Sequence, residues 1–113
     1  MSGAFLVTMS LAYASSTLPD CDSPQSWAAT MAYVQLTNSD INLKEKINPN
    51  STVVTLLASE KIGEDIYRQI HHVDFKLHTG EVITVITSNE ATSEECSYSG
   101  VDVYEVKSKY SSE

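Results

Sequence analysis

Three histidines and an aspartate in one short segment are the residues of this chain that could bind a metal or transfer protons. They are His71, His72, Asp74 and His78. Imidazole nitrogens and carboxylate oxygens are common ligands of transition metals. On a regular strand, however, residues 72 and 78 lie about 20 Å apart, which is too far for one ion. We therefore expect a polar, solvated strand face at this segment and no bound metal.

A second group of residues with possible chemistry is the acidic segment around Cys96. General acid–base catalysis needs carboxylates in a pocket that perturbs their pKa values, whereas a polar loop leaves carboxylates in water. The chain also contains no G-x-S-x-G elbow, no S-x-x-K motif and no glycine-rich phosphate loop. We therefore expect that the protein is not an enzyme and needs no cofactor.

The same acidic segment has the composition of a docking surface for a basic protein. Carboxylates speed the encounter with a basic partner, and tyrosines are common contact residues in protein interfaces. We expect Tyr104 to be a half-buried strand residue at the margin of this surface. The predicted partner-binding residues are Glu90, Glu94, Glu95, Tyr98, Asp102 and Tyr104.

The overall charge restricts which partners the protein can have. The 113 residues include 15 acidic and 7 basic side chains, which gives a net charge of -8 at neutral pH. This charge disfavours nucleic acids and anionic membrane surfaces, because both repel an acidic protein. The length allows one domain with a single modest core.

The N-terminal segment has the composition of a secretory signal. Residues 3–14, GAFLVTMSLAYA, form an apolar run with small residues at its end, and residues 1–43 contain no Lys or Arg. The run is too short to span a membrane as a helix but fits the apolar region of a signal peptide. Because a basic segment before it is missing, either the signal begins upstream of Met1 or the run is a buried strand or helix. We predict a signal-like segment at residues 1–14, one domain at residues 15–113, and a periplasmic or secreted protein without stable membrane insertion.

Export gives the two cysteines a simple interpretation. In an oxidising compartment Cys21 and Cys96 are expected to form one disulfide bond. The bond would close a loop of about 76 residues and stabilise the fold by about 4 kcal/mol. A structural zinc site is disfavoured, because neither cysteine has further ligands at a finger-like spacing.

The pattern of apolar residues predicts one helix near the N-terminal end of the domain. Asp22 or Ser23 can cap a helix over residues 24–36. Trp27, Met31 and Val34 share one side of this helix, and we expect them to form its buried face. Ala28 and Ala32 lie beside them, and their small side chains should allow close approach to a sheet. Residues 37–51 are rich in Asn, Ser, Asp and Pro and are expected to connect the helix to a sheet, with one helical turn at residues 43–47.

The second half of the chain predicts an antiparallel sheet. The expected strands are residues 52–62, 64–78, 81–89 and 101–109. Val73, Phe75 and Leu77 alternate with polar residues, which indicates one buried and one solvated face. Tyr67 shares this alternation but Ile66 and Ile70 do not, so we expect a β-bulge near His71 or His72.

These elements predict an α+β fold in which one N-terminal helix packs on a curved four-stranded antiparallel sheet, of the cystatin-like or NTF2-like type. In the NTF2-like alternative, the domain would bind a small ligand or perform catalysis in an internal pocket, with His72 or Asp74 pointing inward. A structural component of the cell envelope is a third alternative.

One arrangement of residues resembles a known group of proteins. Pro19-Asp20-Cys21-Asp22 opens the helix, and the partner cysteine precedes the last strand. This order, which covers residues 19–106, resembles small secreted or periplasmic bacterial proteins with a cystatin-like fold, the group that includes the immunity protein for colicin M. The resemblance implies the fold and an exported location. From the residues themselves we expect a binding protein with an inhibitor, immunity or accessory role toward another protein.

Overall fold

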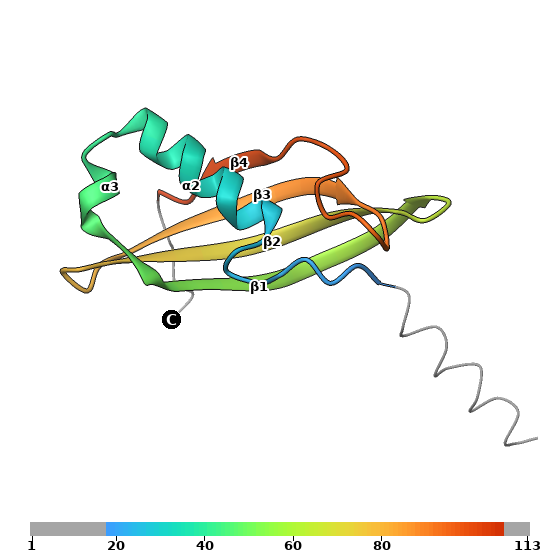
Figure 1. The fold of residues 1–113 in the computed structure, drawn as a ribbon, viewed down its shortest axis with the longest axis horizontal. Coiled ribbons are helices and arrows are strands. Elements are labelled where there is room, and N and C mark those ends of the chain that lie inside the picture. Colours follow the sequence, from blue (N-terminus) through green and yellow to red (C-terminus); the bar gives the residue numbers. More distant parts are fainter. Residues whose placement is uncertain (1–17, 108–113) are drawn as a thin grey trace, which may run out of the picture.

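A four-stranded antiparallel sheet with a helix across it forms the body of the protein. The computed structural model describes residues 18–107; the signal-like segment predicted at residues 1–14 lies outside them. Helix α2 (Trp27–Ser39) and the short helix α3 (Leu43–Lys46) precede the strands. The strands are β1 (Ile47–Gly63), β2 (Ile66–Leu77), β3 (Val82–Ala91) and β4 (Asp102–Glu105), side by side in that order. Figure 1 shows α2 lying across one face of the sheet, so the predicted α+β class is confirmed.

Strand β2 alternates regularly along its whole length. Its pairing with β3 shows no register shift, and every second residue from Tyr67 to Phe75 is buried. We call the face that carries these residues the inner face, because α2 packs on it, and the opposite face the outer face. The β1–β2 pairing is irregular at the predicted place, next to His71, but the extra residue is Leu57 of the edge strand β1, so the bulge predicted in β2 itself is wrong. Two further register shifts, at residues 47–52 and 61–63, also lie on β1, and the alternation of β2 stays intact.

Helix α2 packs on the inner face through small side chains. Its buried residues are Ala28, Ala29, Ala32, Leu36 and Thr37. The buried face predicted at Trp27, Met31 and Val34 is wrong, since the first two are half-buried and Val34 is 38% exposed. Alanines allow the helix backbone to lie close to the sheet, so the larger side chains point to the sides. The helix begins at Trp27 because Ser26 caps it, with the Ala29 N–H donating to Ser26 Oγ at 3.3 Å.

The apolar core lies between α2 and the central strands. Its buried residues are Ala32, Leu36, Ile47, Val73, Phe75 and Val85. The ring of Tyr33 on α2 lies 6.3 Å from the ring of Phe75 on β2, measured between centroids. Strand β1 starts at Ile47 rather than at residue 52, because this side chain is buried in the core and paired with Leu77. The helical turn expected at residues 43–47 corresponds to α3.

The predicted disulfide between Cys21 and Cys96 is present. It joins the segment before α2 to the loop between β3 and β4, and so connects parts of the chain that are far apart in sequence. No helix among residues 18–107 is long and apolar enough to cross a membrane.

Candidate functional site

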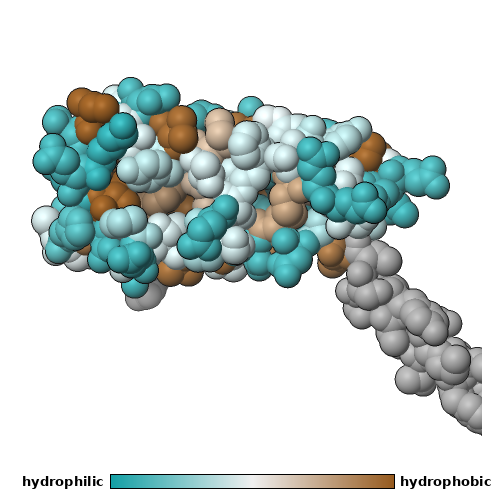
Figure 2. All heavy atoms as spheres, in the orientation of Figure 1, coloured by the Kyte–Doolittle hydropathy of each residue, from teal (hydrophilic) through white to brown (hydrophobic). Residues whose placement is uncertain are grey.

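Two turns of the chain bring carboxylates together at one end of the sheet. The turn between β1 and β2 and the loop over residues 92–101, between β3 and β4, lie at the same end in Figure 1. Figure 2 shows hydrophilic residues gathered there. We call this region the acidic end, and it contains Glu64, Asp65, Glu90, Glu94 and Glu95. Helix α3 and the turn between β2 and β3 lie at the opposite end.

Asp65 connects the turn to the loop. Its carboxylate accepts hydrogen bonds from the backbone N–H of Ser93 at 3.2 Å and from Ser93 Oγ at 2.8 Å. Asp65 has a φ of 58°, a left-handed conformation that aspartate and asparagine adopt more readily than most residues. Sequence reasoning missed this residue, although an aspartate between two predicted strands is a typical turn signal.

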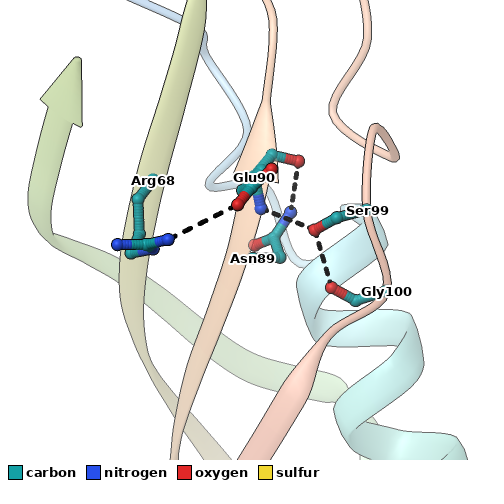
Figure 3. Close-up of polar contacts among 5 residues, drawn as sticks. All are labelled: Arg68, Asn89, Glu90, Ser99 and Gly100. Atoms are coloured by element: carbon teal, nitrogen blue, oxygen red, sulfur yellow. Dashed lines mark hydrogen bonds and ion pairs between the residues drawn. The ribbon is translucent and has the colours of Figure 1, made fainter. Parts of the chain in front are cut away.

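Glu90 lies where β3 meets the loop, and Figure 3 shows how its surroundings fix it. Its backbone N–H donates to Ser99 Oγ at 2.8 Å, and Ser99 Oγ donates in turn to the carbonyl oxygen of Gly100 at 2.8 Å. Its carboxylate lies 3.4 Å from the guanidinium of Arg68 on the neighbouring strand. This partly exposed ion pair is worth at most about 1 kcal/mol, so it orients Glu90 more than it stabilises the fold.

Hydrogen bonds from the helix and from β3 hold the rest of the loop. Trp27 Nε1 donates to the carbonyl oxygen of Ser99 at 2.9 Å, and Gln35 Nε2 donates to that of Val101 at 3.1 Å. Asn89 Nδ2 donates to the carbonyl oxygen of Cys96 at 3.0 Å, beside the disulfide. A loop fixed by one covalent bond and several hydrogen bonds loses little conformational entropy when it binds a partner.

The loop also contains a tight turn of its own. The backbone N–H groups of Glu94 and Glu95 donate to Thr92 Oγ1 at 3.3 and 3.0 Å, and the N–H of Thr92 donates to the carbonyl oxygen of Glu95 at 2.9 Å. Both glutamate side chains are exposed. The turn therefore presents two adjacent carboxylates to solvent in a defined backbone geometry.

Of the remaining predicted partner-binding residues, Tyr98 lies in the loop of the acidic end, and Asp102 and Tyr104 lie beside this end. Tyr98 is 48% exposed in the loop. Asp102 and Tyr104 belong to β4 and lie opposite Ser88 and Ile86 of β3, which places them on the outer face. Tyr104 is 60% exposed, so the prediction that it is half-buried is wrong. The reason is that α2 covers the inner face, and Tyr104 points to the other side of a short edge strand.

The histidine cluster does not converge on one point. His72 and Asp74 lie on the outer face, where His72 Nε2 is 3.8 Å from Asp74 Oδ1. The alternative in which His72 or Asp74 points inward is therefore wrong, and His71 is the histidine that faces the helix. Within residues 18–107 no group of three or more His, Cys, Asp or Glu side chains is placed to hold a metal ion.

Comparison of the chain with protein-family models, with curated proteins and with solved structures finds no match in any of the three. The resemblance to the cystatin-like group therefore stays a prediction.

Proposed function

We propose that this protein is an exported binding module that recognises a basic surface on another protein through its acidic end. The observation that carries the proposal is the construction of that end. Two separate segments carry the carboxylates, and they are fixed by the Cys21–Cys96 disulfide and by the hydrogen bonds of Asp65 and Asn89. Recognition residues are commonly carried by loops that a rigid framework positions.

The charges of the acidic end are available to a partner. Among the described residues, Arg68 forms an ion pair with Glu90, and no ion pair is found for Glu64, Asp65, Glu94 or Glu95. Unpaired surface carboxylates attract a basic protein over a distance of about one Debye length, about 8 Å at physiological salt. The exposed Tyr98 would supply aromatic contact area once the charges have steered the encounter.

The structure of the domain supports an exported binding role in two further ways. The intramolecular disulfide fits an oxidising compartment, that is, a periplasmic or secreted location. The long helix across an antiparallel meander in the order β1-β2-β3-β4 supports the cystatin-like type of α+β fold. Within this type, we propose an inhibitor, immunity or accessory role toward another protein, with binding rather than catalysis as the activity.

The proposal can be tested with two variants of equal charge change. E64Q/E94Q/E95Q, the acidic-end variant, removes three exposed carboxylates from the acidic end. D40N/E45Q/E81Q, the opposite-end variant, removes three exposed carboxylates from the other end of the sheet, near α3 and the turn between β2 and β3. Each variant and the wild type are immobilised and exposed to an extract of the organism's cell envelope at low and high salt.

We expect the wild type and the opposite-end variant to retain the same basic protein at low salt. The acidic-end variant should bind it about ten-fold more slowly, because electrostatic steering is lost. Equal retention by the two variants, or a rate of association that does not change with salt, would contradict the proposal.

A second candidate function is the binding of a small uncharged ligand, and a groove between α2 and β1 favours it. Helix α2 packs on β2, β3 and β4 and makes fewer contacts with the edge strand β1, and the groove lies between the two elements. The groove has a volume of about 410 Å³ and is lined mostly by apolar side chains, among them Tyr33, Ile47 and Phe75, with Gln25, Thr30 and Thr52 as its polar residues. This volume is within the range of small-molecule sites. Titration with an uncharged apolar dye should give saturable binding that A29W abolishes, and unsaturable binding would refute this candidate.

A further inference from the structure

Four polar side chains form a buried cluster on the inner face of the sheet, which we call the polar cluster. They are Gln69 and His71 on β2 and Thr87 and Asn89 on β3. The register places Gln69 opposite Asn89 and His71 opposite Thr87, so the four residues are neighbours in two adjacent pairs. Three of them are 0% exposed and Asn89 is 5% exposed. On both strands the alternation places these polar residues on the same face as the apolar core residues Val73, Phe75 and Val85.

The amide donors of the polar cluster bind the two segments that the disulfide joins. Gln69 Nε2 donates to the carbonyl oxygen of Pro19 at 3.1 Å and to Ser59 Oγ at 3.1 Å. Asn89 Nδ2 donates to the carbonyl oxygen of Cys96 at 3.0 Å. Each side of the disulfide is therefore held to the sheet by one amide group of the cluster.

Five other polar atoms of the cluster have no hydrogen-bond partner among residues 18–107. They are Gln69 Oε1, both ring nitrogens of His71, Thr87 Oγ1 and Asn89 Oδ1. More than about 90% of buried polar groups in proteins are hydrogen-bonded to protein or to ordered water. Five unpaired atoms on four adjacent side chains therefore point to a ligand shared between them.

We propose that the polar cluster is an internal site for ordered water. This water would bridge the amide groups of Gln69 and Asn89, which hold the segments at Pro19 and Cys96, to His71 and Thr87. The amide and hydroxyl oxygens need donors, and neutral imidazole offers one donor and one acceptor. Water supplies two donors and two acceptors in a small volume, which matches this set. Proteins contain about one buried water per 27 residues, so a few such molecules are expected in a domain of this size.

The surroundings of the polar cluster favour a neutral ligand. Burial lowers the pKa of His71, and the carboxylate of Asp22 opposes this shift only in part. Helix α2, which covers the inner face, contains no Asp, Glu, Lys, Arg or His. An ion would therefore lack a buried counter-charge, whereas water needs none. The inference does not depend on the proposed protein partner.

The substitution Thr87→Val tests the proposal through the sign of its effect. If Thr87 Oγ1 is bound to water, the valine variant removes a hydrogen bond, and the ratio of folded to unfolded protein should fall about five-fold. If the cluster is dry, the same change removes an unpaired polar atom, and the ratio should stay constant or rise. Thr55→Val on the outer face is the matched control, because Thr55 is exposed and faces away from α2.

Nuclear magnetic resonance of the wild-type protein gives an independent reading. A long-lived internal water tumbles together with the protein. It should therefore produce a nuclear Overhauser effect from water to the Thr87 methyl group with the same sign as the effects between protons of the protein. The Thr55 methyl group should show no such effect. Absence of the effect at Thr87, or a folded ratio of the Thr87→Val variant that stays constant or rises, would overturn the proposal.

Discussion

Removal of the Cys21–Cys96 disulfide is expected to destabilise the folded protein by about 4.5 kcal/mol. The two cysteines are separated by 75 positions in the sequence. For a loop of this size, the chain-entropy relation gives about 4.5 kcal/mol at 25 °C. Small domains have a free energy of unfolding of about 5–15 kcal/mol, so this loss is a large fraction of the total. The variant C21A/C96A avoids placing a serine hydroxyl at the buried position 21.

The structure also predicts where the reduced protein loosens first. Without the covalent bond, the segment at Pro19 is held by the amide of Gln69, and the part of the loop at Cys96 is held by the amide of Asn89. The single tryptophan of the chain, Trp27, donates to the loop at Ser99 and therefore reports on this contact. Loosening of the loop should change the fluorescence of Trp27 before the β-sheet unfolds.

Urea unfolding, followed by tryptophan fluorescence and by circular dichroism, measures both effects. Wild-type protein is compared with and without a reductant, and C21A/C96A serves as the control on which the reductant should have no effect. A loss below about 1 kcal/mol, far under the chain-entropy value, would refute the reasoning. It would mean that the segments around the two cysteines stay in place without the bond.

Two further perturbations follow from the core. Stability should be constant above pH 6.5, the ordinary pKa of histidine, and should decline by up to about 1.4 kcal/mol per pH unit below it, because burial lowers the pKa of His71 in the folded state. The decline should stop once the pH is below the pKa of His71 in the folded protein. It should be weaker in H71L than in wild type or in the control H72Q. An equal decline in all three proteins would exclude His71 as its cause. Ala32→Leu should lower the free energy of unfolding in urea by about 1–3 kcal/mol, because Ala32 is 0% exposed on the side of α2 that faces the sheet. Val34→Leu, on the exposed side of α2, should change it by no more than about 0.5 kcal/mol. Equal costs at the two positions would contradict the alanine-mediated packing of α2.

The features that could be predicted from sequence are those encoded by local patterns or by few alternatives. The alternation of Val73 and Phe75 with polar residues identified a strand with one buried face, and the structure has it. The disulfide followed from the presence of two cysteines, since only one intramolecular pairing exists. The acidic loop between the last two strands followed from composition, and Glu94 and Glu95 are exposed there.

The features that sequence reasoning missed depend on packing between distant segments. The buried face of α2 was centred on its large apolar residues, with Ala28 and Ala32 only beside them, but close contact with the sheet places the alanines at the centre of that face. The bulge was assigned to β2 because Ile66 and Ile70 fall outside the alternation that Tyr67 shares with Val73 and Phe75. In the folded protein the polar residues Gln69 and His71 are buried in line with Tyr67 and Phe75, so the strand needs no bulge. The contact of Asp65 with the loop joins residues 28 positions apart and has no local signal.

Site-specific photo-crosslinking tests the proposed binding surface most directly. A photoreactive phenylalanine analogue is placed at Tyr98, in the loop of the acidic end, or at Thr79, in the turn between β2 and β3 at the opposite end. Cells that produce each variant are then irradiated. The account predicts a specific crosslink from position 98 to a protein with a basic surface, no crosslink from position 79, and loss of the first when E64Q/E94Q/E95Q is added. A crosslink of equal strength from both positions, or one that survives the three substitutions, would contradict it.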